Sequence, residues 1–210
     1  MKTLKAQHSL LAEAGKQANV KEVRKAMDIC VHNANLAVFT AATQHSQYAG
    51  MGTTLVAGVF LESRLVLGHI GDSRCYRSRQ KQLVQITKDH SLLQEQLDAG
   101  LITAEQAAFS SNKNLVTRAV GVEDNVLLET HLHETMPGDL YLLCSDGLSD
   151  MLADEAIAHV LRGARDVADA GASLIEAAND AGGKDNIAVI LVRVDGAAPT
   201  QRSWWPLRRR

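Results

Sequence analysis

The sequence predicts an α+β domain in which antiparallel sheets pack beneath helices. Strand-like runs rich in β-branched and aromatic residues gather in blocks at 52–87, 126–145 and 186–194. Amphipathic stretches with apolar residues at three- and four-residue spacing stand before, between and after these blocks. Because strands and helices are segregated along the chain, an alternating βαβ fold is disfavoured.

The chain opens with a helical region at 1–48. Its second helix is predicted to begin after Asn19, since Glu22 three positions later completes a capping box. One face of this helix is apolar and needs a sheet or another helix to cover it. The residues of that face are Val23, Met27, Cys30, Ala34, Val38 and Ala41.

The first block of strands comprises 53–61, 64–70 and a hairpin at 75–87. A helical insertion at 88–113 follows.

Two short helices are expected within the insertion. Ser91 and Thr103 are favoured N-cap residues, and Gln106 completes a capping box with Thr103. Gly100 ends the first of these helices.

The second half of the chain completes the order of elements. Strands are expected at 126–134 and 139–145, and helices at 154–162 and 166–181. A last strand is expected at 186–194.

Composition indicates one ordinary globular domain, which we place at 1–196, with a disordered tail at 197–210. The chain has 210 residues, of which 46% are apolar and 22% charged. The formal charge of −2, without a basic run interleaved with aromatic residues, argues against a nucleic-acid surface. The tail sequence QRSWWPLRRR at 201–210 leaves open a contact with an anionic membrane.

The cysteines and the apolar runs of the sequence indicate in which cellular compartment the protein is expected. Cys30, Cys75 and Cys144 show no CxxC spacing and are interpreted as reduced thiols. No signal peptide and no apolar run of about 18 residues is evident, so no transmembrane segment is expected. The expected compartment is the cytoplasm.

Three aspartates stand where strand-like runs meet glycine-containing turns. Asp72 lies in GDSR, Asp146 in SDGL and Asp185 in GGKDN. A buried carboxylate is costly unless it is paired or binds a metal. Clustered oxygen ligands without cysteine or histidine suit Mg²⁺ or Mn²⁺ rather than Zn²⁺.

A topological hypothesis brings two of these aspartates together. If 139–145 and 186–194 are antiparallel neighbours, Asp146 and Asp185 converge at one edge of a sheet. Each motif alone is more typical of a tight turn than of a functional site, because glycine and aspartate are common turn residues. Their joint occurrence favours the metal site.

His131 and His133 are two positions apart and share a strand face. They are compatible with a metal pair, but no third nitrogen or sulfur ligand is evident. A solvated strand face is the favoured interpretation.

Six motifs together resemble one family. In order they are MGTT (51–54), GDSRCY (71–76), TKDHS (87–91), NLVTRAVG (114–121), GDLYLLCSDGLSD (138–150) and GGKDNIAVI (182–190). Their order and spacing resemble the metal-dependent protein phosphatase family, the protein phosphatase 2C or PPM type, and in particular its small bacterial members.

The resemblance implies a β-sandwich of two antiparallel sheets flanked by helix pairs. It also implies two, possibly three, Mn²⁺ or Mg²⁺ ions and hydrolysis of phosphoserine and phosphothreonine in proteins by a metal-activated water. Asp146 and Asp185 fall on ligands of the first metal, and Asp72 on a ligand of a weaker third ion shared with Asp146. The resemblance also implies that the insertion at 88–113 is a mobile flap beside the cleft. The adjoining Ser73, Gly147 and Asn186 are expected to support these ligands. Implied partners are phosphorylated proteins and a serine/threonine kinase with its targets.

One departure from the family pattern leaves two hypotheses open. Family members carry a phosphate-binding arginine, a Glu-Asp pair and a DGxGGH-like segment in their first strands, and none of these occurs here. The chain is therefore expected to be an N-terminally incomplete phosphatase, with the rest of the site supplied by a missing segment. The alternative is a catalytically silent phosphatase-like module that binds phosphoproteins or a regulatory partner.

Overall fold

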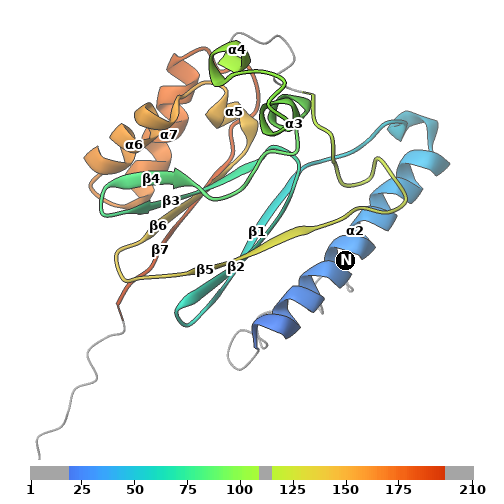
Figure 1. The fold of residues 1–210 in the computed structure, drawn as a ribbon, viewed down its shortest axis with the longest axis horizontal. Coiled ribbons are helices and arrows are strands. Elements are labelled where there is room, and N and C mark those ends of the chain that lie inside the picture. Colours follow the sequence, from blue (N-terminus) through green and yellow to red (C-terminus); the bar gives the residue numbers. More distant parts are fainter. Residues whose placement is uncertain (1–18, 109–114, 197–210) are drawn as a thin grey trace, which may run out of the picture.

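A computed structural model describes residues 19–108 and 115–196 and contains two antiparallel sheets faced by helices (Figure 1). The helices are α2 (Val20–Gln44), the 3₁₀ turn η1 (Ser46–Tyr48), α3 (Leu92–Asp98), α4 (Ala104–Ala108), α5 (Asp146–Ser149), α6 (Asp154–Gly163) and α7 (Val167–Asp180). The strands are β1 (Leu55–Leu61), β2 (Arg64–Ile70), β3 (Arg74–Arg79), β4 (Gln82–Gln85), β5 (Glu129–Glu134), β6 (Leu140–Cys144) and β7 (Val189–Arg193).

The first sheet has the order β1-β2-β5, and β2 at its centre is buried on both faces. Val66 and Ile70 of β2 belong to a core cluster with Val23 and Met27 of α2, so this helix covers the outer face of the sheet. A sheet covers this helix as predicted, but the buried face comprises Val23, Met27, Val31 and Asn35, and the predicted Ala34 is exposed.

The second sheet has the order β4-β3-β6-β7. Its outer face packs against α6 and α7, where Leu142 of β6 shares a cluster with Ile157 and Leu174. A third cluster that includes Leu67 of β2 and Tyr141 of β6 joins the two sheets. The order from α2 through two sheets to α6 and α7 confirms the predicted α+β fold (Figure 1).

Local sequence signals are reproduced in the helices. Asn19 and Glu22 form the reciprocal hydrogen bonds of a capping box at the start of α2. Ser91 caps α3 by accepting from the backbone N–H of Gln94, and Thr103 and Gln106 form the second reciprocal pair. These caps satisfy backbone N–H groups that a helix cannot pair internally.

The strands are shorter than their apolar runs. The predicted antiparallel pairing of the last two strands is confirmed, with Cys144 opposite Val189. However, β7 begins at Val189 and not at 186, because the Ser145 side chain binds the backbone of Asn186 and Ala188 in place of a ladder. Similarly, β5 begins at Glu129, opposite His69 of β2.

Several predictions fall outside the described residues. These are the first helix within 1–18, the part of the insertion at 109–114 and the tail at 197–210. No helix in the described part of the chain combines the length and apolar character needed to cross a membrane.

Candidate functional site

Asp72 lies in the turn between β2 and β3. Gly71 before it has φ +96°, a left-handed conformation that favours glycine, and a Cβ there would overlap the side chain of Thr54. The buried Ser73 after it is fixed by a 2.8 Å hydrogen bond between its hydroxyl and that of Thr54. The turn that carries Asp72 is therefore held against the start of β1.

Asp146 and Asp185 lie on two segments in direct contact. The Ser145 hydroxyl donates to the carbonyl of Asn186 at 3.1 Å and accepts from the N–H of Ala188 at 3.0 Å. A side chain at Gly147 would overlap the Asn186 carbonyl oxygen, so only glycine allows this approach. The structure thus brings the SDGL and GGKDN motifs together at one end of the second sheet.

The carboxylates at this end have no cationic partner. In the described part of the chain, no ion pair includes Asp72, Asp146 or Asp185. Burial, and next the negative charge of Asp146, raise the pKa of Asp72 to about 6, with smaller contributions from Asp89 and Asp150. Negative charges held near one another in this way would be stabilised by a divalent cation, and their oxygen donors fit Mn²⁺ or Mg²⁺.

The three aspartates do not form a compact set of ligands. Within the described residues, the three acidic or histidine side chains whose ligand atoms all lie within 4.8 Å of one another are His69, Glu129 and His131. The ligand roles of Asp72, Asp146 and Asp185 consequently remain predictions.

A set of contacts between β3 and residues 88–91 was not anticipated from the sequence. The Arg74 guanidinium binds the Asp89 carboxylate at 2.7 Å and donates to the Tyr76 hydroxyl. The backbone N–H of His90 donates to the carbonyl of Gly71, whose own N–H donates to Nδ1 of His90. The insertion therefore starts from a segment fixed beside Asp72.

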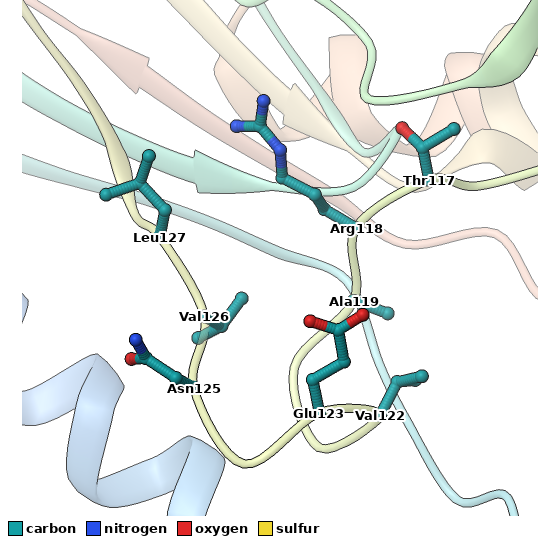
Figure 2. A pocket seen from close by; sticks show the side chains of 8 residues that line it. All are labelled: Thr117, Arg118, Ala119, Val122, Glu123, Asn125, Val126 and Leu127. Atoms are coloured by element: carbon teal, nitrogen blue, oxygen red, sulfur yellow. The ribbon is translucent and has the colours of Figure 1, made fainter.

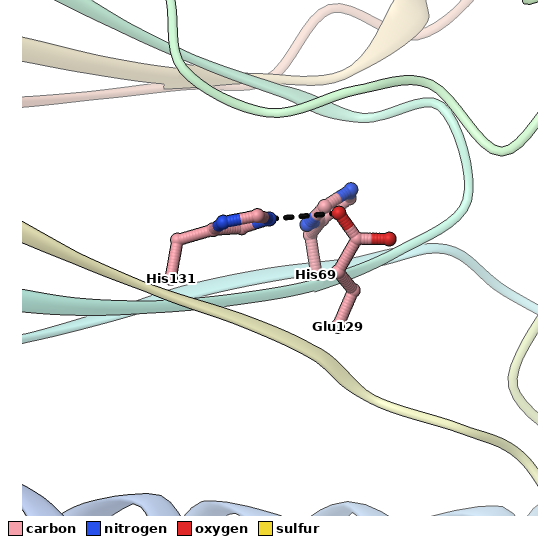
Figure 3. Close-up of side chains that lie close together, drawn as sticks. All are labelled: His69, Glu129 and His131. Carbon is pink, nitrogen blue, oxygen red and sulfur yellow. Dashed lines mark hydrogen bonds and ion pairs between the residues drawn. The ribbon is translucent and has the colours of Figure 1, made fainter.

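The cluster of His69, Glu129 and His131 lies on the face of the first sheet opposite α2 (Figure 3). The register of β2 and β5 places Glu129 opposite His69, and His131 shares its strand face with His133. Of the His131–His133 pair considered from the sequence, only His131 belongs to this cluster, and the other histidine is His69 of the neighbouring strand. Only the pairing of strands could have revealed it.

A pocket of about 280 Å³ is lined by residues that precede β5 in the chain (Figure 2). Its lining residues lie between 117 and 127 and include none of the predicted metal ligands. Arg118 connects the two features, since it lines the pocket and its Nη1 lies 3.9 Å from Glu129 Oε2.

The model of the family described as protein phosphatase 2C matches residues 1–192. The chain belongs to this family. It is 35% identical over 190 residues to the serine/threonine phosphatase Stp of Listeria monocytogenes, across 89% of this chain and 75% of that protein. It is also 42% identical over 169 residues to the phosphatase PstP of Mycobacterium tuberculosis, across 80% of this chain and 32% of that protein.

Solved structures support the same conclusion. The serine/threonine phosphatase of S. agalactiae matches with a TM-score of 0.82 and 33% identity, over 91% of this chain and 80% of that one. The PstP catalytic domain, in a complex with two manganese ions, matches with a TM-score of 0.79 and 36% identity, over 93% of this chain and 80% of that one. The predicted β-sandwich and the predicted enzyme class, a protein serine/threonine phosphatase by family, are confirmed.

Proposed function

We propose that this protein is a metal-dependent phosphatase that hydrolyses phosphoserine and phosphothreonine in proteins. The observation that carries the proposal is that Asp72, Asp146 and Asp185, at one end of the sheets, have no ion-pair partner among the described residues, and that burial and Asp146 raise the pKa of Asp72. The family and the manganese-bound relative support it. The substrates would be phosphoproteins, including a serine/threonine kinase and its targets.

In this proposal Asp146 and Asp185 hold the first Mn²⁺ or Mg²⁺ ion, and Asp72 shares a more weakly held ion with Asp146. When bound, such ions lower the pKa of a water and neutralise charge on the phosphoryl group. The chain's own contribution is positioning. The close contact between Gly147 and Asn186 sets the separation of the two segments that carry Asp146 and Asp185.

A catalytically silent binding module has no support from the comparisons, because the relatives are named as phosphatases. The two hypotheses differ in one measurable property, which is turnover by the 210-residue chain itself.

The decisive experiment is hydrolysis of para-nitrophenyl phosphate and a phosphothreonine peptide by the purified chain, with Mn²⁺ titrated. The proposal predicts metal-dependent turnover that Asp146→Asn removes. Asp195→Asn is the matched control, because Asp195 is exposed and its ion-pair partner in the described part of the chain is Arg193 at the end of β7. Absence of turnover from a folded chain at saturating Mn²⁺ would contradict activity of the 210-residue chain on its own.

A further inference from the structure

Two buried histidine nitrogens in the first sheet have no hydrogen-bond partner among the described residues, Nδ1 of His69 and Nε2 of His133. The His69 side chain is fully buried, and its Nε2 lies 2.8 Å from the carbonyl oxygen of Lys88. Because a carbonyl only accepts, Nε2 carries the proton and Nδ1 keeps its lone pair. That Nδ1 is buried and makes no hydrogen bond to any described residue. A buried acceptor without a partner is unfavourable unless another group binds it.

Two further side chains able to bind a metal lie beside the His69 ring. Glu129 faces His69 across the β2–β5 pair, and His131 follows two positions later on the same strand face. The ligand atoms of His69, Glu129 and His131 all lie within 4.8 Å of one another. Figure 3 shows the three side chains turned toward one another, with His131 Nε2 2.7 Å from Glu129 Oε1.

We propose that His69, Glu129 and His131 form a binding site for a transition-metal ion of the zinc type, separate from the aspartates. Two imidazoles and one carboxylate are a donor set that suits Zn²⁺, which binds three protein ligands and a water in open sites. His69 binds through Nδ1. Its Nε2–H bond to the Lys88 carbonyl is the arrangement that usually orients a metal-binding histidine.

The ligand atoms of His69, Glu129 and His131 must move closer together to bind the ion. Zinc–nitrogen and zinc–oxygen bonds of about 2.0–2.1 Å in a tetrahedron place neighbouring ligand atoms about 3.3 Å apart. The side chains of Glu129 and His131 are 32% and 41% exposed, so they can rotate toward the fixed ring of His69. On binding, the ion takes the place of the proton between His131 and Glu129.

Protonation states favour the ion. Burial lowers the pKa of His69, so its ring is neutral near pH 7. Burial also acts to raise the pKa of Glu129, but hydrogen bonds from His90 and His131 outweigh it and lower this pKa to about 2. The carboxylate is therefore charged and available as a ligand.

Two neighbouring groups act on the carboxylate without being ligands. His90 accepts from the N–H of Gly71 at Nδ1, so its Nε2–H donates to Glu129 Oε2 at 3.0 Å and orients it. Arg118 lies 3.9 Å from the same oxygen and its positive charge opposes a cation. Since the Arg118 side chain is 41% exposed, it can turn toward solvent when the ion binds.

The test measures Zn²⁺ affinity by competition with a chromophoric chelator, using the full chain in an Asp146→Asn background that weakens binding at the aspartates. Addition of His131→Gln or Glu129→Gln is expected to weaken binding at least about tenfold, because each removes a ligand. Co²⁺ bound to the parent chain should show the intense visible absorption of a four-coordinate ion, and His131→Gln should abolish it.

His133→Gln is the matched control, since His133 lies on the same strand face two positions further and is not in the cluster. It should change the affinity less than about twofold. Circular dichroism establishes that each variant is folded, and two independent ligand variants are available because both side chains are partly exposed. Equal Zn²⁺ affinity in the parent and in both ligand variants, or an equal loss with His133→Gln, would overturn the proposal.

Discussion

The aspartates at the two ends of strand β6 differ in how their negative charge is compensated. Asp139 precedes the strand and is buried, and the Arg79 guanidinium binds both of its oxygens at 2.7 and 2.8 Å. Asp146 follows the strand and has no ion-pair partner among the described residues, while its charge contributes to raising the pKa of Asp72. One carboxylate is compensated within the protein, and the other is arranged so that an added cation would compensate it.

The pKa of Asp139 illustrates the contrast. Burial acts to raise it, but the hydrogen bonds from Arg79 and from the backbone N–H of Met136 outweigh burial and lower it. For Asp72, burial and like charges outweigh a backbone hydrogen bond, and its pKa rises to about 6. We call the end of β6 at Asp139 the structural end and the end at Asp146, near Asp72, the chemical end.

The largest expected effect is at the chemical end. Asp185→Asn should reduce turnover with Mn²⁺ by at least about 100-fold, because the proposed first ion would lose one of its two aspartates and the charge that attracts it. Steady-state hydrolysis of a phosphothreonine peptide measures this. Asp180→Asn, at the end of α7, serves as a control that leaves the rate unchanged. Retained turnover in Asp185→Asn would remove Asp185 from the site.

At the structural end the effect falls on stability. Asp139→Ala should destabilise the fold by about 3 kcal/mol, because it leaves the Arg79 charge and the Met136 N–H without their buried acceptor. Urea denaturation at pH 7 measures this loss. Removal of Asp195, whose pair with Arg193 is exposed, should cost less than about 1 kcal/mol.

The stability that the Arg79–Asp139 pair contributes depends on pH. A carboxyl whose folded pKa is lowered contributes stability above its unfolded pKa and loses it as the pH falls through the folded value. The difference in unfolding free energy between the parent and Asp139→Ala should therefore shrink below about pH 4. A difference that is constant from pH 7 to pH 3 would show that lost packing, not charge, causes the destabilisation.

Gly147→Ala tests whether the chemical end depends on close backbone contact. An added Cβ would overlap the Asn186 carbonyl oxygen and force the two segments apart, at a cost of about 2 kcal/mol. The half-saturating Mn²⁺ concentration for turnover should rise, because Asp146 and Asp185 separate. Gly163→Ala is the control, since a Cβ there meets nothing within 4 Å.

Local signals made much of the fold predictable. The capping box at Asn19 and Glu22 placed the start of α2, and the apolar runs located the strands of both sheets. Motifs at turns identified Asp72, Asp146 and Asp185 because a short stretch of sequence contains all of the signal for each of them. Boundaries were less accurate, since Ser145 replaces the expected ladder at 186–188.

Long-range features could not be predicted in the same way. Arg79 and Asp139 are 60 positions apart, and both residues are ordinary surface types in the sequence. His69 joins Glu129 only through the register of β2 and β5. A shift of one residue in that register would place Glu129 on the opposite face, so no local pattern determines the cluster.

The smallest expected effect distinguishes the two kinds of aspartate most directly. Asp72→Asn removes a negative charge that faces Asp146 without removing an ion pair, so the metal-free fold should keep or slightly gain stability. Turnover should fall by only a few-fold, and only at limiting Mn²⁺, because Asp72 would serve the more weakly held ion. Measurement of thermal unfolding without metal and of Mn²⁺ dependence on one preparation tests both statements. Destabilisation comparable to that of Asp139→Ala would mean that Asp72 is a structural carboxylate and that both ends of β6 are built alike.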